Sequence, residues 1–197
     1  MFWKPKHEDF IQKYKIDKSI TTQLIKFFKK THFGTAGRKK GKVGKYETDT
    51  VRKDSTDLGI VTDHVLKNKW VKEYYEELEI CLELYKKKYN YSNYQQSSFL
   101  LEGGNIQEYK PNQGYKIWHY ENNGCTISGK RHLVYMTYLN DCPHAGTEFF
   151  YQNKRYQCKA GDTLIWPAAW THTHKGEISK KQTKNKYIIT GWWRYAD

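Results

Sequence analysis

Apolar residues in the first half of the chain recur every three or four positions, which is the spacing of a helix that buries one face. The segment 63–89 shows this most clearly, with Lys and Glu on its other face. Its apolar positions are Leu66, Trp70, Tyr74, Leu78, Cys81, Leu82 and Tyr85. They predict a helix about 40 Å long with a core-facing seam. A shorter helix is predicted over residues 19–33, where Ser19 or Thr21 could cap the start.

The pattern changes from Ser98 onward, where short runs rich in Tyr, Ile, Val, Thr and Trp alternate with Gly, Asn, Asp and Pro. The runs are NIQEYK, YKIWHYE, RHLVYMTYL, TEFFYQ, KRYQCK, TLIWPA and KYIITGWWRY. They predict about seven or eight strands of a sandwich or barrel such as a jelly roll. We therefore expect one α+β domain over residues 1–197. Its N-terminal part (1–97) would be mainly helical and would pack on one outer face of a jelly-roll core (98–197).

The composition supports the predicted strands and favours a cytoplasmic location. Aromatic residues make up 16% of the chain, and they favour strands. The chain has no long apolar run, which excludes a transmembrane helix, and MFWKPKHEDF has no apolar signal-peptide core. Its four cysteines include no CxxC pair, so we expect reduced thiols in a cytoplasmic protein.

The net charge is +13, which favours acidic partners such as nucleic acid, an acidic protein or a small polyanion. A lysine-rich surface without a partner would give the same balance. The basic, glycine-rich segment 34–44 has the composition of a flexible loop or of a flap over a substrate groove. It is not a phosphate-binding loop, because no Gly-Lys-Ser/Thr ends it.

The candidate chemistry centres on WHYEN. His119 and Glu121 lie two positions apart, so both would project from one face of a strand. A further imidazole would come from THTH, where His172 and His174 share a face and the pattern does not separate them. Two histidines and one carboxylate form the facial triad of non-haem Fe(II) oxygenases. Zinc accepts the same ligands, but a zinc site would give the downstream Lys186 no role.

From about Ile106 to Tyr195 the chain resembles the Fe(II)- and 2-oxoglutarate-dependent oxygenases, specifically the prolyl 4-hydroxylase-like group with its short phage and viral members. The motifs that carry the resemblance are EYKPNQGYKIWHYEN, RHLVYMTYLND, AGTEFFYQ, KAGDTLIWPAAWTHTHKG and KYIITGWW. The resemblance implies a double-stranded β-helix, with Fe(II) and 2-oxoglutarate as cofactors and ascorbate as an accessory reductant.

The resemblance also implies roles for individual residues. It assigns the iron to His119, Glu121 and His174, in preference to His172, although most members have Asp where this chain has Glu121. Lys186 and Tyr138 would hold the far carboxylate of 2-oxoglutarate, and Tyr109 would lie near its metal-facing end. Thr190 and Trp192 fall on the strand that closes the pocket.

The expected activity is hydroxylation of a C–H bond, with release of succinate and CO₂. A prolyl side chain of a protein or peptide is the first expected substrate. A nucleic acid or a small metabolite is the alternative, and a non-catalytic jelly-roll binding module is a further one. A phage or viral member would work in the host cytoplasm. The sequence does not indicate the oligomeric state.

Overall fold

The computed structural model describes residues 8–34, 37–43, 48–96 and 99–196. The helices are α1 (Lys18–Lys30), α2 (Thr62–Lys67), α3 (Lys69–Lys88) and the short 3₁₀ helices η1 (Asn90–Gln96) and η2 (Trp170–His172). The strands are β1 (Gln12–Lys15), β2 (Lys39–Lys40), β3 (Lys53–Asp54), β4 (Thr56–Ile60), β5 (Phe99–Tyr109), β6 (Gly114–Tyr115), β7 (Arg131–Tyr138), β8 (Cys142–Phe149), β9 (Lys154–Cys158), β10 (Asp162–Pro167), β11 (His174–Gly176) and β12 (Lys186–Tyr195).

The helix predicted over 63–89 is two helices. Asn68 ends α2, and its side-chain oxygen accepts hydrogen bonds from the N–H groups of Trp70 and Val71, which caps α3. Leu66 therefore lies outside the buried seam and is 75% exposed. The rest of the predicted seam is confirmed in α3, apart from Trp70, which is only partly buried.

The shorter predicted helix is confirmed as α1, but its N-cap is a different residue from the two that were predicted. The carboxylate of Asp17, rather than Ser19 or Thr21, caps the helix by accepting the N–H of Ser19 at 2.6 Å. An ionised carboxylate at this end also interacts favourably with the helix dipole. The buried face of α1 carries Ile20, Leu24 and Phe28.

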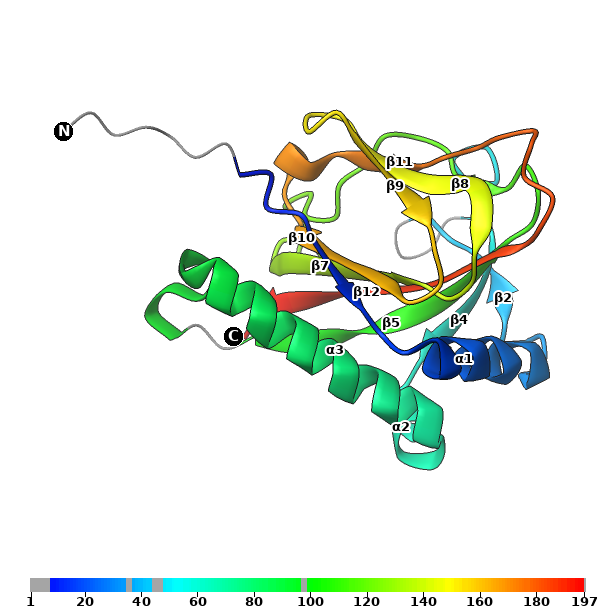
Figure 1. The fold of residues 1–197 in the computed structure, drawn as a ribbon, viewed down its shortest axis with the longest axis horizontal. Coiled ribbons are helices and arrows are strands. Elements are labelled where there is room, and N and C mark those ends of the chain that lie inside the picture. The colour runs from blue at the N-terminus through cyan, green and yellow to red at the C-terminus, as the bar shows by residue number, and fades with distance from the viewer. Residues whose placement is uncertain (1–7, 35–36, 44–47, 97–98, 197) are drawn as a thin grey trace.

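The strands form two facing sheets, which confirms the predicted jelly-roll arrangement. The larger sheet has the order β1-β10-β7-β12-β5-β4-β2, and a three-stranded sheet has the order β11-β8-β9. β3 and β6 form a separate pair, and every strand pair is antiparallel. The helices α1 and α3 cover one face of the larger sheet, whereas β8, β9 and β11 lie over its other face (Figure 1).

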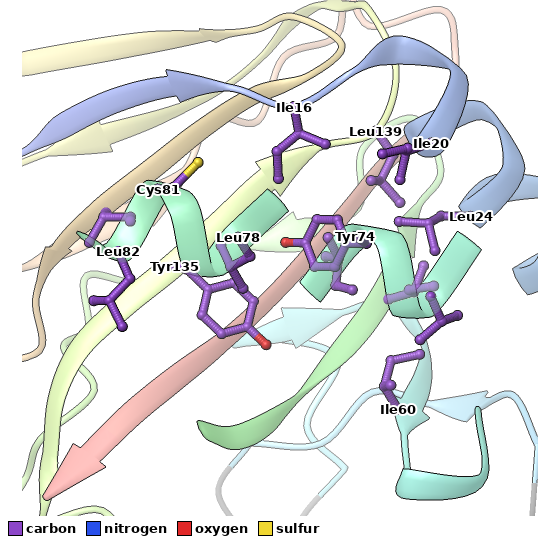
Figure 2. Close-up of a cluster of buried hydrophobic side chains, with 14 of the residues drawn as sticks. Ile16, Ile20, Leu24, Ile60, Tyr74, Leu78, Cys81, Leu82, Tyr135 and Leu139 are labelled. Carbon is purple, nitrogen blue, oxygen red and sulfur yellow. The ribbon is translucent and has the colours of Figure 1, made fainter. Parts of the chain in front are cut away.

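Each face of the larger sheet has its own hydrophobic core. Along β7, Leu133 and Tyr135 pack against the helices, whereas Val134, Met136 and Tyr138 point between the sheets. This alternation follows from the two-residue period of a strand. The core on the helix side joins α1 and α3 to the sheet (Figure 2). The core between the sheets fixes the walls of the cavity described below.

The N-terminal part also contributes strands, which the helical spacing did not reveal. β1 adds an edge to the larger sheet beside β10, and β4 pairs with β5 on the other side. Conversely, only the first residue of the run YKIWHYE, Tyr115, lies in a strand, which is β6. Beyond it, His119 makes only an isolated bridge with His174. Within the described ranges, no helix is long and apolar enough to cross a membrane.

Candidate metal centre and cofactor cavity

A cavity of about 880 Å³ opens between the two sheets. Most of the residues singled out in the sequence line it; they are Tyr109, His119, Glu121, His174, Lys186, Thr190 and Trp192. Tyr138 and His172 are not among the lining residues. Basic side chains from the N-terminal part also line it, namely Lys39, Lys40, Lys42, Arg52 and Lys53.

His119, Glu121 and His174 come together at this cavity, with one donor atom from each within 4.8 Å of the others. The Nε2 atoms of His119 and His174 lie 3.5 and 3.7 Å from Oε1 of Glu121. Two backbone hydrogen bonds between His119 and His174, at 3.0 and 2.9 Å, hold the segments together. The predicted proximity of His119 and Glu121 is therefore present, although the segment is not a regular strand. Glu121 N–H instead donates to the carbonyl of Ala168 at 3.1 Å.

The backbone fixes the tautomer of both histidines. Nδ1 of His119 lies 3.0 Å from the carbonyl of Ile117, and Nδ1 of His174 lies 2.9 Å from that of His172. A carbonyl only accepts, so Nδ1 donates in both rings, and Nε2 is the nitrogen left free to offer a lone pair to a bound metal. The ring of His119 also stacks on Tyr115, with centroids 3.5 Å apart. Such outer contacts are typical of histidines that hold a metal.

Glu121 is held as a carboxylate by its neighbours. Burial raises its pKa, but His119, His174 and Arg131 outweigh burial and lower the pKa to about 2. The indole N–H of Trp192 donates to Oε2 of Glu121 at 3.0 Å. The guanidinium of Arg131 lies 3.5 Å above the ring of Trp192 and 3.5 Å from the same oxygen.

The sequence analysis did not single out Arg131. It precedes the buried run LVYMTY and has no motif of its own; its ion pair with Glu102, at 2.6 Å, is visible only in the fold. This pair holds the guanidinium against Trp192 and Glu121, so Arg131 orients the carboxylate rather than facing outward as a surface charge.

His172 has a different environment from His174, which the sequence pattern did not show. The expected common strand face is absent, because His172 ends the 3₁₀ helix η2 and only His174 begins a strand. Nε2 of His172 lies 2.8 Å from the carbonyl of Asp9, and Nδ1 lies 3.0 Å from Oγ1 of Thr171. Both ring nitrogens of His172 thus have partners, and the contact of Nε2 with Asp9 anchors the N-terminal segment.

Lys186 supplies a buried cation to the same cavity. Its side chain is almost entirely buried, and its Nζ donates to the carbonyl of Gly146 at 3.2 Å. The rings of Tyr109 and Tyr138 each lie 5.6 Å from Nζ. Burial lowers the pKa of this lysine, and it forms no ion pair with a carboxylate in the described ranges. A buried ammonium with so few partners fits an anionic group bound in the cavity.

The hydroxyl groups near Lys186 already have protein partners. Tyr138 donates to Oγ1 of Thr147 at 2.7 Å, and Tyr109 donates to Oε1 of Gln107 at 2.6 Å. Thr190 donates to a backbone carbonyl. Thr147 itself lines the cavity, but the sequence analysis did not identify it because its strand motif, AGTEFF, gave no chemical signal.

The donor set fits both cofactors of the resemblance. Two imidazole nitrogens and a carboxylate are the ligands of non-haem Fe(II) sites, and His119, Glu121 and His174 would hold such a metal at the wall of the cavity. The buried ammonium of Lys186 matches the far carboxylate of a dicarboxylic acid.

Comparison with known proteins agrees with this geometry. Residues 104–194 match the model of the 2OG-Fe(II) oxygenase superfamily, and no curated protein matches the chain. A viral collagen prolyl hydroxylase from Paramecium bursaria Chlorella virus-1, solved with 2-oxoglutarate, is 17% identical with a TM-score of 0.70, over 95% of this chain and 97% of that one. A Pseudomonas putida prolyl-4-hydroxylase is 12% identical with a TM-score of 0.67, over 93% and 92%.

A Trichoplax adhaerens prolyl hydroxylase, in complex with a peptide fragment of hypoxia inducible factor, is 14% identical with a TM-score of 0.67, over 94% of this chain and 84% of that one. At these identities the likeness establishes the fold, which is the double-stranded β-helix expected from the resemblance. The family match adds the chemistry and covers the segment that carries the triad. Residues 104–194 are thus the oxygenase core of a 2-oxoglutarate- and Fe(II)-dependent dioxygenase with the fold of the prolyl 4-hydroxylases.

Proposed function

We propose that this dioxygenase hydroxylates a prolyl side chain of a protein or peptide. His119, Glu121 and His174 would hold Fe(II), and Lys186 would hold the far carboxylate of 2-oxoglutarate. The observation that carries the assignment is that one cavity contains both the three converging donors and a buried ammonium without a carboxylate partner in the described ranges.

When bound, the two cofactors supply the oxidative chemistry, in which O₂ converts 2-oxoglutarate to succinate and CO₂ and a C–H bond gains one oxygen atom. The chain supplies position and environment. Arg131 and Trp192 orient the carboxylate of Glu121. Met136, Trp166 and Ile188 give the cavity an apolar wall, which limits the access of water.

Two observations support a polypeptide substrate. The structures described above are prolyl hydroxylases, and one of them holds a peptide. The mouth of the cavity also carries the half-exposed rings of Trp118 and Tyr120, which offer contact surface to a chain lying across it.

The test begins with anaerobic addition of Fe(II) and 2-oxoglutarate to the purified protein. We expect the weak visible charge-transfer band of a 2-oxo acid on Fe(II), and its loss in His119→Ala. Replacement of the exposed His32 by alanine is the matched control and should leave the band intact. A wild-type protein that bound zinc but gave no band would contradict the cofactor assignment.

Proline-containing peptides are then incubated with the complete enzyme and O₂. We expect a gain of one oxygen atom by mass spectrometry and stoichiometric succinate. Peptides with alanine in place of proline should stay unmodified. If only an oligonucleotide or a small metabolite were oxidised, the prolyl assignment would be wrong while the cofactor assignment would stand.

A further inference from the structure

Four exposed aromatic side chains form a row of ring contacts that starts at the cavity wall and continues over the surface. These are Trp118, Phe150, Tyr151 and Trp170, and they are 39%, 55%, 59% and 60% exposed. Successive ring centroids lie 5.1, 5.1 and 5.7 Å apart. We call this set the aromatic row. Single exposed apolar residues are ordinary, but contiguous large rings on a surface mark an interaction site.

The aromatic row is built from segments that are distant in sequence. Trp118 belongs to the segment after β6, Phe150 and Tyr151 to the turn between β8 and β9, and Trp170 to η2. The β8–β9 turn and η2 lie at the same end of the molecule (Figure 1). Because three segments supply the rings, their contact is a product of the fold rather than of one apolar stretch.

The aromatic row leads into the proposed active site. Trp118 lines the cavity and directly precedes the proposed metal ligand His119. The Nζ of Lys175, another lining residue, lies 4.5 Å from the ring of Trp118. A chain bound along the row would therefore enter the cavity beside the triad.

We propose that the aromatic row binds an extended, proline-containing segment of the polypeptide substrate next to the residue that is hydroxylated. This inference rests on the proposed function. Proline favours the polyproline II conformation, which loses little entropy on binding and docks on aromatic-lined surfaces. The row spans at most about 16 Å, which corresponds to about five residues at 3.1 Å per residue.

The ring geometry favours a peptide over single-stranded nucleic acid. Neighbouring planes in the aromatic row are inclined at 79°, 81° and 83°, so faces and edges alternate. Successive bases stack on aromatic faces, and rings turned at right angles to one another cannot all present parallel faces. A polyproline II helix presents its residues around a threefold axis and can meet rings in different orientations.

The test measures binding separately from turnover. The probes are the peptide (Pro-Ala)₅, the proline-free peptide (Gly-Ala)₅ and the oligonucleotide dT₁₀, each titrated against the full chain loaded with Mn(II) and 2-oxoglutarate. We expect (Pro-Ala)₅ to bind at least ~10-fold more tightly than (Gly-Ala)₅. The double variant Phe150→Ala/Trp170→Ala should lose at least ~10-fold of that affinity, because rings of this kind dominate binding energy at interfaces.

Two variants control for non-specific effects. Trp170→Phe keeps a ring at the same place and should retain most of the affinity. Ile80→Ala/Leu84→Ala removes exposed apolar side chains from α3, on the other side of the larger sheet, and should change nothing (Figure 1). The affinity for 2-oxoglutarate should be the same in every variant, which shows that the cavity is intact.

Three results would overturn the inference. The first is equal affinity for (Pro-Ala)₅ in the wild type and in Phe150→Ala/Trp170→Ala, including no binding to either protein. The second is that dT₁₀ binds more tightly than (Pro-Ala)₅ and loses this affinity in the double variant. The third is that the wild type is a dimer and the double variant is a monomer. If (Pro-Ala)₅ bound through the row but no proline gained oxygen, the inference would stand and the prolyl hydroxylation would fail. If proline were hydroxylated and the double variant had an unchanged KM for the peptide, the prolyl hydroxylation would stand and the inference would fail.

Discussion

Replacing Lys186 with methionine should weaken the binding of 2-oxoglutarate while leaving the ligand-free fold at least as stable as before. The two effects have opposite signs because the ammonium is buried and donates to one carbonyl, that of Gly146. Without an anion in the cavity, the buried charge is a cost of folding. With 2-oxoglutarate bound, the same charge would gain a carboxylate partner.

The size of each effect follows from the contacts. A charge-assisted hydrogen bond contributes about 1.5–3 kcal/mol, and removal of one partner of a buried charge pair costs roughly 2–5 kcal/mol. We therefore expect Lys186→Met to lose about 3 kcal/mol of binding free energy, or roughly 150-fold in Kd. The free energy of unfolding of the ligand-free protein should stay constant or rise by about 1 kcal/mol, since an unbranched apolar side chain of similar length replaces the cation.

The assay is chemical unfolding of the Mn(II)-loaded protein with and without 2-oxoglutarate. At a concentration 100 times its Kd, 2-oxoglutarate should stabilise the wild type by about 2.7 kcal/mol. At the same concentration it should stabilise Lys186→Met by only about 0.3 kcal/mol. 2-Oxopentanoate, which lacks the far carboxylate, should bind both proteins with the same affinity, because it cannot use the ammonium.

The pH dependence of unfolding tests independently whether the buried charge of Lys186 destabilises the ligand-free protein. Burial lowers the pKa of Lys186 below the ordinary value of about 10.4. Between the two values the unfolded chain binds more protons at this residue, so its contribution to stability rises with pH. Any advantage of ligand-free Lys186→Met over wild type should therefore shrink as the pH rises through this window. Equal 2-oxoglutarate affinity in the two proteins, or a variant that unfolds more easily, would refute the argument.

Three further predictions concern the surroundings of the triad. His174→Ala should abolish Fe(II) binding, whereas His172→Ala should lower the free energy of unfolding by about 2 kcal/mol and leave 2-oxoglutarate turnover intact; the opposite pattern would exchange their roles. Trp192→Phe should lower the affinity for Fe(II) by ~10-fold in a metal titration, since Glu121 loses its indole donor, and an unchanged affinity would remove Trp192 from the site. Cys125 is the exposed thiol, and its hydrogen bonds to Ser128 lower its pKa, so it alone among the four cysteines should react quickly with a thiol reagent. Rapid reaction of two or more thiols in the native protein would contradict the burial of the others.

The sequence predicted the elements whose apolar residues form distinct runs or recur at a helical spacing. β7 and β12 were predicted because strands buried on both faces are nearly continuous apolar runs. The seam of α3 was predicted because helical spacing is regular over its whole length. The proximity of His119 and Glu121 followed from their two-residue spacing, even though irregular backbone rather than a strand presents them.

The distinction between His172 and His174 depended on backbone that the residues do not specify. A 3₁₀ turn over Trp170–His172 rotates one imidazole toward the N-terminal segment and leaves the next to begin β11. The same two-residue spacing therefore gave the correct proximity for one pair and a wrong common face for the other. A two-residue spacing implies a common face only where the secondary structure is regular. His119 and Glu121 converge because backbone hydrogen bonds to His174 and Ala168 hold their irregular segment in place.

The N-terminal part shows why a local pattern did not predict the whole cavity. The segment around 34–44 has the composition of a loop, yet Lys39 and Lys40 pair with β4 and, with Lys42, line the cavity. Gly41 makes this approach possible, because a Cβ there would lie 2.1 Å from Oγ of Ser55. These lysines are therefore not a free loop, whereas the flap over a substrate groove stays a prediction; residues 35, 36 and 44 of the segment lie outside the described residues.

The buried pair beneath that segment explains why the first 60 residues matter to the site. Nζ of Lys53 lies 2.7 Å from Asp57, whose other oxygen accepts from Ser55, and Lys53 and Asp57 both line the cavity. Separating two such buried charges is costly, so the pair fixes the wall rather than leaving it mobile. The matched core of residues 104–194 supplies the triad and Lys186, but this wall comes from outside it. The N-terminal part is therefore structurally part of the cavity, because its charged side chains complete a wall that the matched core does not supply.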